Sequence, residues 1–323
     1  MPPDVSIIVV SYNTRELTLA CLRSVIEQTR PGTFELIVID NASEDGSPDA
    51  IAESFPDLRL IRSPENLGFA GANNLAAREA TGRYLLLLNP DTLVRDGAIN
   101  KLLDFAREHP DARIWGGRTV FADGTLNPTS CWRRQSCWSL TTQALGLNVL
   151  FASSELFNPE TFGRWARDRV RRVDIVSGCF FLIERELWAA LDGFDPAFFM
   201  YGEEADLCLR AHAFGARPMV TPNATIVHYG GASERVRGDK IAKVLIARTT
   251  LMHRHWRPTQ VAFGLLMVRV RVLLRFFGYK AAARFGRAGA SEQAKAWGAV
   301  WAQRERWTRG APSTASTATV GCA

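Results

Sequence analysis

Short apolar runs alternate with stretches of helical periodicity in the first third of the chain. The apolar runs predict four strands, at Val5–Ser11, Phe34–Ile39, Leu58–Ile61 and Tyr84–Leu88. The stretches that follow them predict helices at Glu16–Gln28, Ser47–Phe55 and Gly71–Ala80, and a fourth that ends near Glu108. Because strands and helices alternate with short connections, we expect an α/β fold in which a mostly parallel central sheet is flanked by helices.

The second half of the chain has a less regular pattern. Ile114–Phe121 predicts another strand, Val173–Ile183 predicts a strand interrupted by Gly178, and Glu203–Phe214 predicts a helix. Two short strands are expected at Pro218–Thr221 and Thr225–Tyr229. The segment 126–172 is irregular and rich in Trp and Arg.

Positive charge is concentrated near the C-terminus. The chain has a net charge of +6, but residues 254–309 hold twelve Lys or Arg and two Asp or Glu, a local balance of +10, so the remainder sums to −4. This asymmetry does not predict a nucleic-acid-binding protein. The segment 261–277 is apolar but contains Arg269, Arg271 and Arg275, which argues against a membrane-spanning helix. It fits a helix in an anionic membrane interface, or a helix packed on the rest of the protein or on a second copy of the chain.

Cysteine usage and the first residues bear on location. Six cysteines are scattered without CxxC spacing, which favours free thiols in a reducing cytosol over a disulfide framework or a zinc site. No basic stretch precedes the first strand, so no signal peptide is expected. We expect a cytoplasmic protein, peripheral on the inner face of the plasma membrane.

The run Leu85–Leu88 predicts a strand that is buried on both faces, followed by Asn89, Pro90 and Asp91. Ligands bind at the carboxyl ends of strands in open α/β sheets. A carboxylate in that place is suited to hold a hard divalent cation against a diphosphate. The alternative is that the three residues form only a turn.

Two further segments follow strands at the same edge. Asp40 ends the second strand and can accept a hydrogen bond from a base or a ribose hydroxyl, or can form an Asx turn. The loop 66–74 has two glycines that allow close backbone approach, before a helix N-terminus that favours anions. It is neither a Walker A loop nor GxGxxG, and a structural glycine turn is its alternative explanation.

Three carboxylates, Glu203, Glu204 and Asp206, start a predicted helix directly after an aromatic stretch. They are either partners of the helix dipole or, because apolar surroundings raise a carboxyl pKa, candidates for a general base. His228 precedes a glycine-containing loop that could face a phosphate, although a lone histidine is more often structural.

The order and spacing of these segments resemble the inverting nucleotide-sugar glycosyltransferases of family 2, which have the GT-A fold. The resemblance covers about residues 4–235. The matching segments are Val-Val-Ser-Tyr-Asn at 9–13, Asp-Asn-Ala-Ser at 40–43, Asn-Leu-Gly-Phe-Ala-Gly-Ala-Asn-Asn at 66–74, Leu-Leu-Asn-Pro-Asp-Thr at 87–92, Ser-Gly-Cys-Phe-Phe-Leu-Ile at 177–183, Gly-Phe-Asp at 193–195, Tyr-Gly-Glu-Glu-Ala-Asp-Leu-Cys-Leu-Arg at 201–210 and His-Tyr-Gly-Gly-Ala-Ser at 228–233.

The resemblance implies roles for individual residues. Glu204 matches the catalytic base, Asp91 matches the metal-binding second acid of the DXD motif, and His228 matches a histidine near the metal or the diphosphate. The residues implied in nucleotide-sugar binding are Ser11, Tyr12, Asp40, Asn66, Gly68, Asn73 and Asn89. Glu203, Asp206 and Ser233 are secondary candidates.

Asn89 departs from the family pattern, because many members have aspartate there. The implied cofactor is Mg²⁺ or Mn²⁺, held by Asp91, His228, phosphate oxygens and water. The Asn-Pro-Asp variant resembles the rhamnosyltransferase-like branch and points to dTDP-L-rhamnose as donor, with a saccharide or polyprenyl-linked acceptor in bacterial surface polysaccharide synthesis. The Trp- and Arg-rich segment 127–172 is then either a lid over the acceptor, with aromatic side chains stacked on sugar rings, or an insertion that only packs on the rest of the protein.

The resemblance also implies a division of the chain. Residues 1–235 form the GT-A catalytic domain, with a nucleotide-sugar half at 1–110 and an acceptor half at 111–235. Beyond the resemblance, charge and composition predict a basic amphipathic helical extension at residues 236–307 and a disordered tail at 308–323, and the protein is a possible homo-oligomer. Two other functions remain as alternatives: a sugar-phosphate nucleotidyltransferase, whose usual N-terminal phosphate loop is not found here, and a non-catalytic carbohydrate-binding protein.

Overall fold

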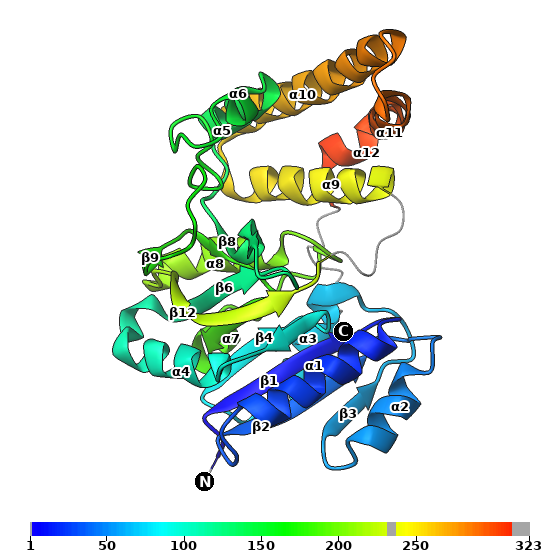
Figure 1. Ribbon diagram of the computed structural model, residues 1–323. Coiled ribbons are helices and arrows are strands. Elements are labelled where there is room, and N and C mark those ends of the chain that lie inside the picture. Colours follow the sequence, from blue (N-terminus) through cyan, green and yellow to red (C-terminus); the bar gives the residue numbers. More distant parts are fainter. Residues whose placement is uncertain (1, 231–236, 312–323) are drawn as a thin grey trace, which may run out of the picture.

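A ten-stranded mixed sheet forms the larger part of the molecule (Figure 1). The computed structural model describes residues 2–230 and 237–311. The main path of the sheet runs in the order β3-β2-β1-β4-β11-β6-β12-β5, with β7 beside β6 and β9 beside β12. Its strands are β1 (Val5–Ser11), β2 (Phe34–Asp40), β3 (Arg59–Arg62), β4 (Tyr84–Leu88), β5 (Thr92–Val94), β6 (Ile114–Val120), β7 (Leu126–Asn127), β9 (Arg171–Arg172), β11 (Phe180–Glu184) and β12 (Met219–His228).

The N-terminal half of the sheet is parallel. β1 pairs in parallel with β2 and β4, and Ser11 lies opposite Asp40 in the register. β11 runs antiparallel to both β4 and β6, whereas β12 is parallel to β6. The parallel strands therefore bring their carboxyl ends, and the loops that follow, to one edge.

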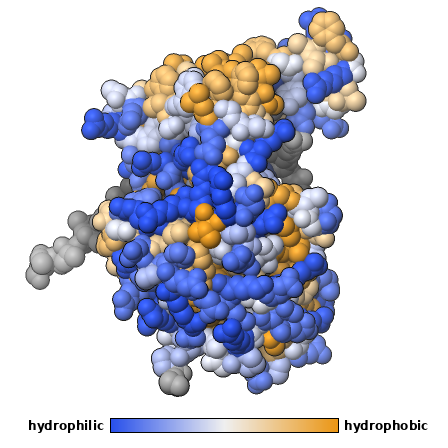
Figure 2. Space-filling model, turned by 60° about the vertical axis from the view of Figure 1, so that its left-hand side comes forward, coloured by the Kyte–Doolittle hydropathy of each residue, from blue (hydrophilic) through white to orange (hydrophobic). Residues whose placement is uncertain are grey.

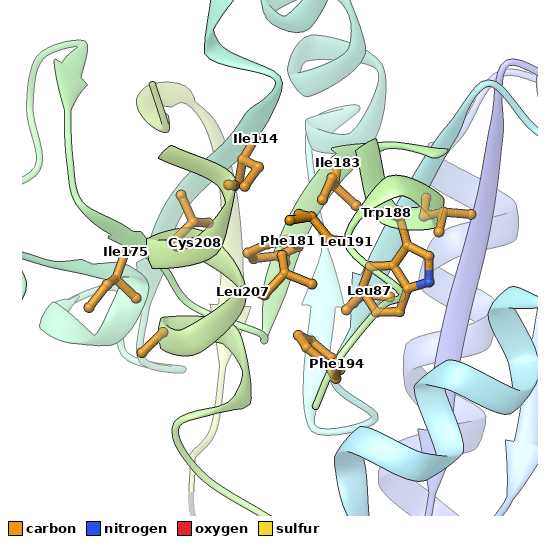
Figure 3. Packing of buried hydrophobic residues seen from close by; sticks show 14 of the residues in the cluster. Leu87, Ile114, Ile175, Phe181, Ile183, Trp188, Leu191, Phe194, Leu207 and Cys208 are labelled. Carbon is orange, nitrogen blue, oxygen red and sulfur yellow. The ribbon is translucent and has the colours of Figure 1, made fainter. Parts of the chain in front are cut away.

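Helices cover both faces of the sheet, because β1 and β4 are buried along their whole length. One face packs against α1 (Arg15–Gln28), α2 (Ser47–Ser54) and α4 (Ala98–Glu108). The other packs against α3 (Gly68–Ala77), α7 (Arg185–Ala190) and α8 (Glu203–Ala211). Figure 3 shows this second core, in which Leu87 and Phe181 of the sheet meet Trp188, Phe194 and Leu207. The expected α/β class with a central sheet flanked by helices is confirmed, but the sheet is mixed rather than mostly parallel, because β5, β7, β9 and β11 pair antiparallel with their neighbours.

Two predicted strand patterns are wrong in detail. The apolar run 173–183 forms two strands in different sheets: β10 (Ile175–Val176) pairs with β8 (Cys131–Trp132), and β11 enters the main sheet after a turn at Gly178. A Cβ on Gly178 would lie 3.2 Å from the ring of Phe69, so the turn is packed against a distant segment. The two short strands expected around Pro222 are the single strand β12, with an irregularity between Val220 and Thr225.

A separate helical unit stands beside the sheet (Figure 1). It contains α5 (Cys137–Ala144), α6 (Leu147–Leu150), α9 (Arg237–His255), α10 (Pro258–Arg284), α11 (Ala290–Ala302) and α12 (Arg304–Arg309). Its own core includes Leu140 from α5 together with Met252, Val268 and Trp307. The segment predicted to be irregular thus supplies helices to this unit.

Two expectations about the ends of this unit can be compared with the described residues. α12 continues to Arg309, so Thr308 and Arg309 are helical, and the rest of the expected tail from residue 312 lies outside them. No helix in the described part of the chain combines the length and apolar character needed to cross a membrane.

Candidate active site

Ser11 and Asp40 are the last residues of the neighbouring strands β1 and β2, at the sheet edge where the candidate site begins. The Asn41 amide donates to the Ser11 carbonyl at 2.8 Å. One carboxylate oxygen of Asp40 accepts from the Ser43 amide at 3.0 Å, so the Asx turn exists. The other oxygen is buried without a protein partner and remains available as an acceptor.

The two residues expected beside Asp40 face different surroundings. The Ser11 hydroxyl is fully buried and lies 3.1 Å from the hydroxyl of Thr18 in α1. Tyr12 is 38% exposed at the strand edge. The structure therefore leaves Tyr12, rather than the Ser11 hydroxyl, open to a ligand.

The loop before α3 is fixed by two asparagine side chains. The Asn66 side-chain oxygen accepts from the Asn41 side chain at 3.0 Å and from the Gly68 amide at 2.9 Å. The Asn41 side-chain oxygen in turn accepts from the Leu67 amide at 2.9 Å. Asn73 is buried in α3, where it donates to the Phe69 carbonyl. Sequence reasoning did not single out Asn41, although its position beside Asp40 at a strand end was a usable signal.

The same loop contacts the aromatic segment that precedes α8. The Phe69 amide donates to the Phe199 carbonyl at 2.8 Å. Gly68 has φ +71°, and a Cβ there would lie 2.2 Å from the Phe199 carbonyl oxygen, so only glycine fits. These contacts join the start of α3 to the start of α8.

Asn74 makes a second connection between these parts. Its side chain accepts from the Phe194 amide at 2.9 Å and donates to the Phe194 carbonyl at 2.7 Å. Sequence reasoning missed this role, because an asparagine inside a helix gives no signal of its distant partner. The hydrogen bonds to Phe199 and to Phe194, here called the two clamps, together fix the aromatic segment against α3.

Asp91 and His228 come together from the loop after β4 and the end of β12. The Tyr229 amide donates to the Asp91 carbonyl, and His228 Nε2 lies 3.3 Å from Asp91 Oδ1. Burial favours the neutral imidazole, but the nearby Cys179 thiol and Asp91 carboxylate raise the pKa of His228 to about 10. The two side chains therefore form an ion pair at neutral pH. His228 Nδ1 is buried without a protein partner.

Asn89 is partly exposed beside this pair and is held by its backbone. Its amide donates to the Cys179 carbonyl at 3.2 Å, and its carbonyl accepts from the Thr92 hydroxyl at 2.7 Å. Across residues 2–230 and 237–311, no group of three or more His, Cys, Asp or Glu side chains could hold a metal ion by itself. Among these four residue types, Asp91 and His228 are the two that come together here.

Glu203 and Glu204 form an acid pair at the start of α8. The preceding Gly202 has φ +89°, and a Cβ there would lie 3.2 Å from the Phe198 ring, which is itself buried. Burial raises the pKa of both glutamates, and the charge of Glu204 raises that of Glu203 further. One carboxylate oxygen of each is buried without a partner. Such a carboxyl group is suited to accept a proton near neutral pH.

Asp206, the third acid of this helix, has partners on both sides. It accepts from Arg210 at 2.7 Å and lies 2.9 Å from His255 of α9. Burial alone would raise the pKa of Asp206, but His255 and Arg210 lower it overall. A second ion pair joins Asp195 to Arg254 of α9. These contacts make Asp206 a link between α8 and the helical unit.

The remaining candidate, Ser233, lies outside the described residues.

Solved structures share this architecture. The mannosyltransferase PcManGT from Pyrobaculum calidifontis, in complex with GDP-Man and Mn²⁺, matches with a TM-score of 0.58 and 20% identity over 94% of this chain and 88% of its own. Residues 1–349 of S. aureus TarS, in complex with UDP, match with a TM-score of 0.51 and 17% identity over 85% of this chain and 72% of theirs. At these identities the similarity concerns the fold, which is the GT-A glycosyltransferase fold.

Sequence comparison defines the family. The profile described as "Glycosyl transferase family 2" matches residues 6–187, more than half of the chain, so the protein belongs to this family. Membership favours a glycosyltransferase over the nucleotidyltransferase and the non-catalytic binding protein.

Three curated relatives are similar at lower coverage. The O-antigen biosynthesis protein RfbC of Myxococcus xanthus is 27% identical over 72% of this chain, which spans 18% of that relative. The N-acetylglucosaminyl-diphospho-decaprenol L-rhamnosyltransferase of Mycobacterium tuberculosis is 28% identical over 60% of this chain and 66% of its own length. The succinoglycan biosynthesis protein ExoO of Rhizobium meliloti is 28% identical over 78% and 69%, respectively.

Proposed function

We propose that the protein is an inverting glycosyltransferase that moves a sugar from a nucleoside-diphosphate donor to a hydroxyl group of a saccharide or lipid-linked acceptor. The acid pair carries this proposal. Glu204 is partly exposed, has a raised pKa and keeps one unpartnered oxygen, while the clamps to Phe194 and Phe199 fix the approach to α8.

In the proposed reaction, Glu204 removes the proton from the acceptor hydroxyl as it attacks the anomeric carbon opposite the leaving diphosphate. This geometry inverts the configuration at that carbon. Glu203 is the more deeply buried member, only 4% exposed, and its pKa is raised further by Glu204. Because two adjacent buried carboxyl groups disfavour double ionisation, Glu203 keeps its proton while Glu204 acts as the base.

We further propose that the sheet edge binds the donor. Tyr12 and the free oxygen of Asp40 would contact the nucleoside. The loop of Asn66 and Gly68 would lie along the nucleotide-sugar. Ser11, Asn73 and Asn89, which are bonded within the protein, would support these groups from behind. In this division residues 1–110 form the nucleotide-sugar half and 111–235 the acceptor half.

Asp91 and His228 would hold Mg²⁺ or Mn²⁺ together with donor phosphate oxygens and water. The residues fit this role, since magnesium sites often use one or two protein ligands plus substrate phosphates. A cation at Asp91 would replace the proton of the His228 imidazolium, and the neutral ring would then offer a nitrogen as a ligand. A bound cation would neutralise charge on the diphosphate leaving group. The Pyrobaculum mannosyltransferase structure and a structure of GalNAc-T7 contain Mn²⁺, which supports the proposal.

The donor is proposed to be dTDP-L-rhamnose, and the pathway the synthesis of a bacterial surface polysaccharide. The names of the mycobacterial relative and of RfbC support this choice. A thermal-shift panel of UDP-, GDP- and dTDP-sugars, with and without Mn²⁺, tests it. We expect the largest stabilisation by the dTDP-sugar with Mn²⁺; a larger response to another nucleotide would reject this donor.

Glu204→Gln tests the catalytic assignment. We expect nucleotide-sugar binding to be retained while turnover falls by about 10²–10⁴-fold, the usual contribution of a general base. Glu186→Gln is a matched control, because Glu186 is an exposed acid in the first turn of α7. Near-normal transfer by the Glu204 variant would exclude it as the base.

We also propose that the helical unit contacts an anionic membrane from the cytoplasmic side. α10 is apolar on both sides: Val268 and Val272 are buried inside the unit, whereas Leu266 and Phe277 are 51% and 57% exposed. Figure 2 shows apolar surface gathered at this end of the molecule. Exposed basic residues accompany it, at Arg269, Lys280, Arg284 and Arg287. An apolar face with basic neighbours is complementary to an anionic lipid surface.

The double variant Leu266→Ser/Phe277→Ser tests the membrane contact without removing the inner packing of α10. We expect loss of co-sedimentation with phosphatidylglycerol vesicles and an unchanged melting temperature. Conversion of a dimer to a monomer by the same variant, with vesicle binding retained, would instead make this face a contact between two copies.

A further inference from the structure

An arginine-lined cavity lies away from the acid pair. Its volume is about 190 Å³, room for about six water molecules and hence for a phosphate group. Arg133 follows β8, Arg171 and Arg172 form β9, and Arg217 precedes β12. Arginines from three separate segments therefore line one cavity, which we call the arginine cavity.

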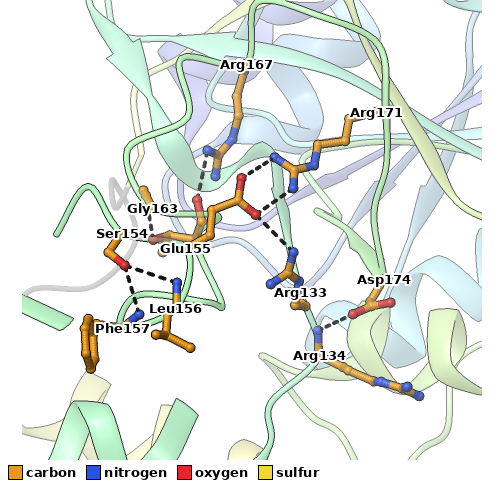
Figure 4. A network of polar contacts seen from close by, with 11 residues as sticks. Arg133, Arg134, Ser154, Glu155, Leu156, Phe157, Gly163, Arg167, Arg171 and Asp174 are labelled. Carbon is orange, nitrogen blue, oxygen red and sulfur yellow. Dashed lines mark hydrogen bonds and ion pairs between the residues drawn. The ribbon is translucent and has the colours of Figure 1, made fainter. Parts of the chain in front are cut away.

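Two of these arginines are held in place by one carboxylate and one aromatic ring. Glu155 accepts from Arg171 at 2.8 and 3.0 Å and from Arg133 at 3.2 Å (Figure 4). The guanidinium carbons of Arg171 and Arg133 lie 4.3 and 4.7 Å from the centre of the Phe162 ring. The aromatic residue at this place thus orients arginines instead of offering a free face to a sugar.

The arginine cavity keeps an excess of positive charge. Its four arginines face two carboxylates, Glu155 and the lining Asp174, which leaves a balance of +2. Within the described parts of the chain, neither Arg172 nor Arg217 has an ion-pair partner. Arg217 donates only to backbone carbonyl groups, and the Arg172 side chain is exposed.

His212 adds a neutral polar group to the lining. Its Nε2 atom is buried and has no protein partner. Burial lowers the pKa of His212, and the nearby Arg217 lowers it too, so the ring is neutral at pH 7. A ligand with negative charge and several oxygen acceptors would satisfy the arginines, and a hydroxyl group on it could donate to this nitrogen.

We propose that the arginine cavity binds the phosphate or diphosphate group of a lipid-linked acceptor, an inference that rests on the proposed function. Two connections support it. Asp174 is four residues from Gly178, which packs on Phe69 of the loop 66–74, here called the donor loop because it is proposed to lie along the donor. The chain between Asp174 and Gly178 spans at most about 14 Å. On the other side, Leu156 directly follows Glu155, is 61% exposed, and accepts through its carbonyl from the Trp138 indole of α5 in the helical unit.

The order of these surfaces matches the order of groups in such an acceptor. The arginine cavity is connected on one side, through Glu155 and Leu156, to α5 of the helical unit, and on the other side, through Asp174 and Gly178, to the donor loop. A lipid-linked sugar presents an apolar chain, a phosphate or diphosphate, and then the accepting hydroxyl. Figure 2, which brings the β9 side forward, shows a hydrophilic band directly below the apolar end.

The test compares Arg172→Ser/Arg217→Ser with Arg169→Ser. Arg169 is an exposed arginine of the same segment that does not line the cavity. Calorimetric titration with inorganic pyrophosphate in the presence of a chelator measures binding without a metal. We expect the double variant to bind at least about tenfold more weakly, a change of about 1.4 kcal/mol, and the control to bind like the wild type. Melting temperatures check that all three proteins are folded.

Two further measurements separate this inference from the proposed function and from simple membrane binding. A nucleoside diphosphate with Mn²⁺ should stabilise all three proteins equally; failure to stabilise the wild type would overturn the proposed function itself. If nucleotide binding is normal but pyrophosphate binding is unchanged in the double variant, the acceptor site is refuted. If the double variant loses only its binding to phosphatidylglycerol vesicles, the arginines contact membrane headgroups, and the acceptor site is also refuted.

Discussion

Gly68→Ala tests the contact that joins the donor loop to the segment before α8. At this position φ is +71°, and an added Cβ would lie 2.2 Å from the Phe199 carbonyl oxygen and 2.7 Å from its ring. The neighbouring Phe69 amide donates to that same carbonyl. The methyl group can fit only if the Phe199 backbone moves away.

The expected cost has three parts. Left-handed backbone for alanine costs about 1–2 kcal/mol. Displacing Phe199 weakens the hydrogen bond from Phe69, about 0.5–1.5 kcal/mol, and overpacking adds about 1–3 kcal/mol. We therefore expect the free energy of unfolding to fall by about 3–5 kcal/mol, since the three effects share one displacement and do not add fully.

Gly124→Ala separates backbone strain from the clash. Gly124 has φ +82°, but nothing lies within 4 Å of a Cβ built there, so only the strain of about 1–2 kcal/mol applies. Urea unfolding measures both variants, and a nucleoside-diphosphate titration should show weaker binding for Gly68→Ala alone. Equal losses of stability in the two variants would refute the contact with Phe199.

Three other outcomes follow from the site. Asp91→Asn should abolish the extra stabilisation that Mn²⁺ gives with a nucleoside diphosphate; a full response in thermal shift would remove Asp91 from the metal site. Glu203→Gln should raise stability above neutral pH, because a raised carboxyl pKa supplies stability only at low pH and loses it as pH rises through that pKa. Urea unfolding against pH checks this, and the gain should vanish below the ordinary carboxyl pKa. Asn74→Ala removes two hydrogen bonds to Phe194 and should cost about 1–3 kcal/mol in urea unfolding, whereas a loss below ~0.5 kcal/mol would show that the clamp is weak.

The parallel half of the sheet was predictable because its strands are buried on both faces. β1 and β4 have the bounds that the apolar runs predict, and helices fill the intervals. The run 173–183 misled because apolarity does not reveal a turn, and the turn at Gly178 is set by packing on Phe69, far away in sequence. α5 was missed for a similar reason, since its buried residues face α10 and not the sheet.

The site was predictable where strand ends bring residues to one edge. Asp91 and His228, expected at one metal site, do lie together. Asn41 and Asn74 were missed because an amide side chain that holds distant backbone has no local pattern. Asp206 looked like a third free acid, since nothing in the sequence indicates that His255 reaches it.

The ion pairs between α8 and α9 bear on how this chain can be divided. Asp206 is 1% exposed and pairs with His255, and Asp195 pairs with Arg254. Both partners lie beyond the expected boundary at residue 235. Removing one partner of a buried pair commonly costs about 3–5 kcal/mol, so a fragment that stops at this boundary would lose stability beside its own acid pair. A chimera that joined residues 1–235 to the helices of a relative would have to bring an imidazole and a guanidinium to the same places.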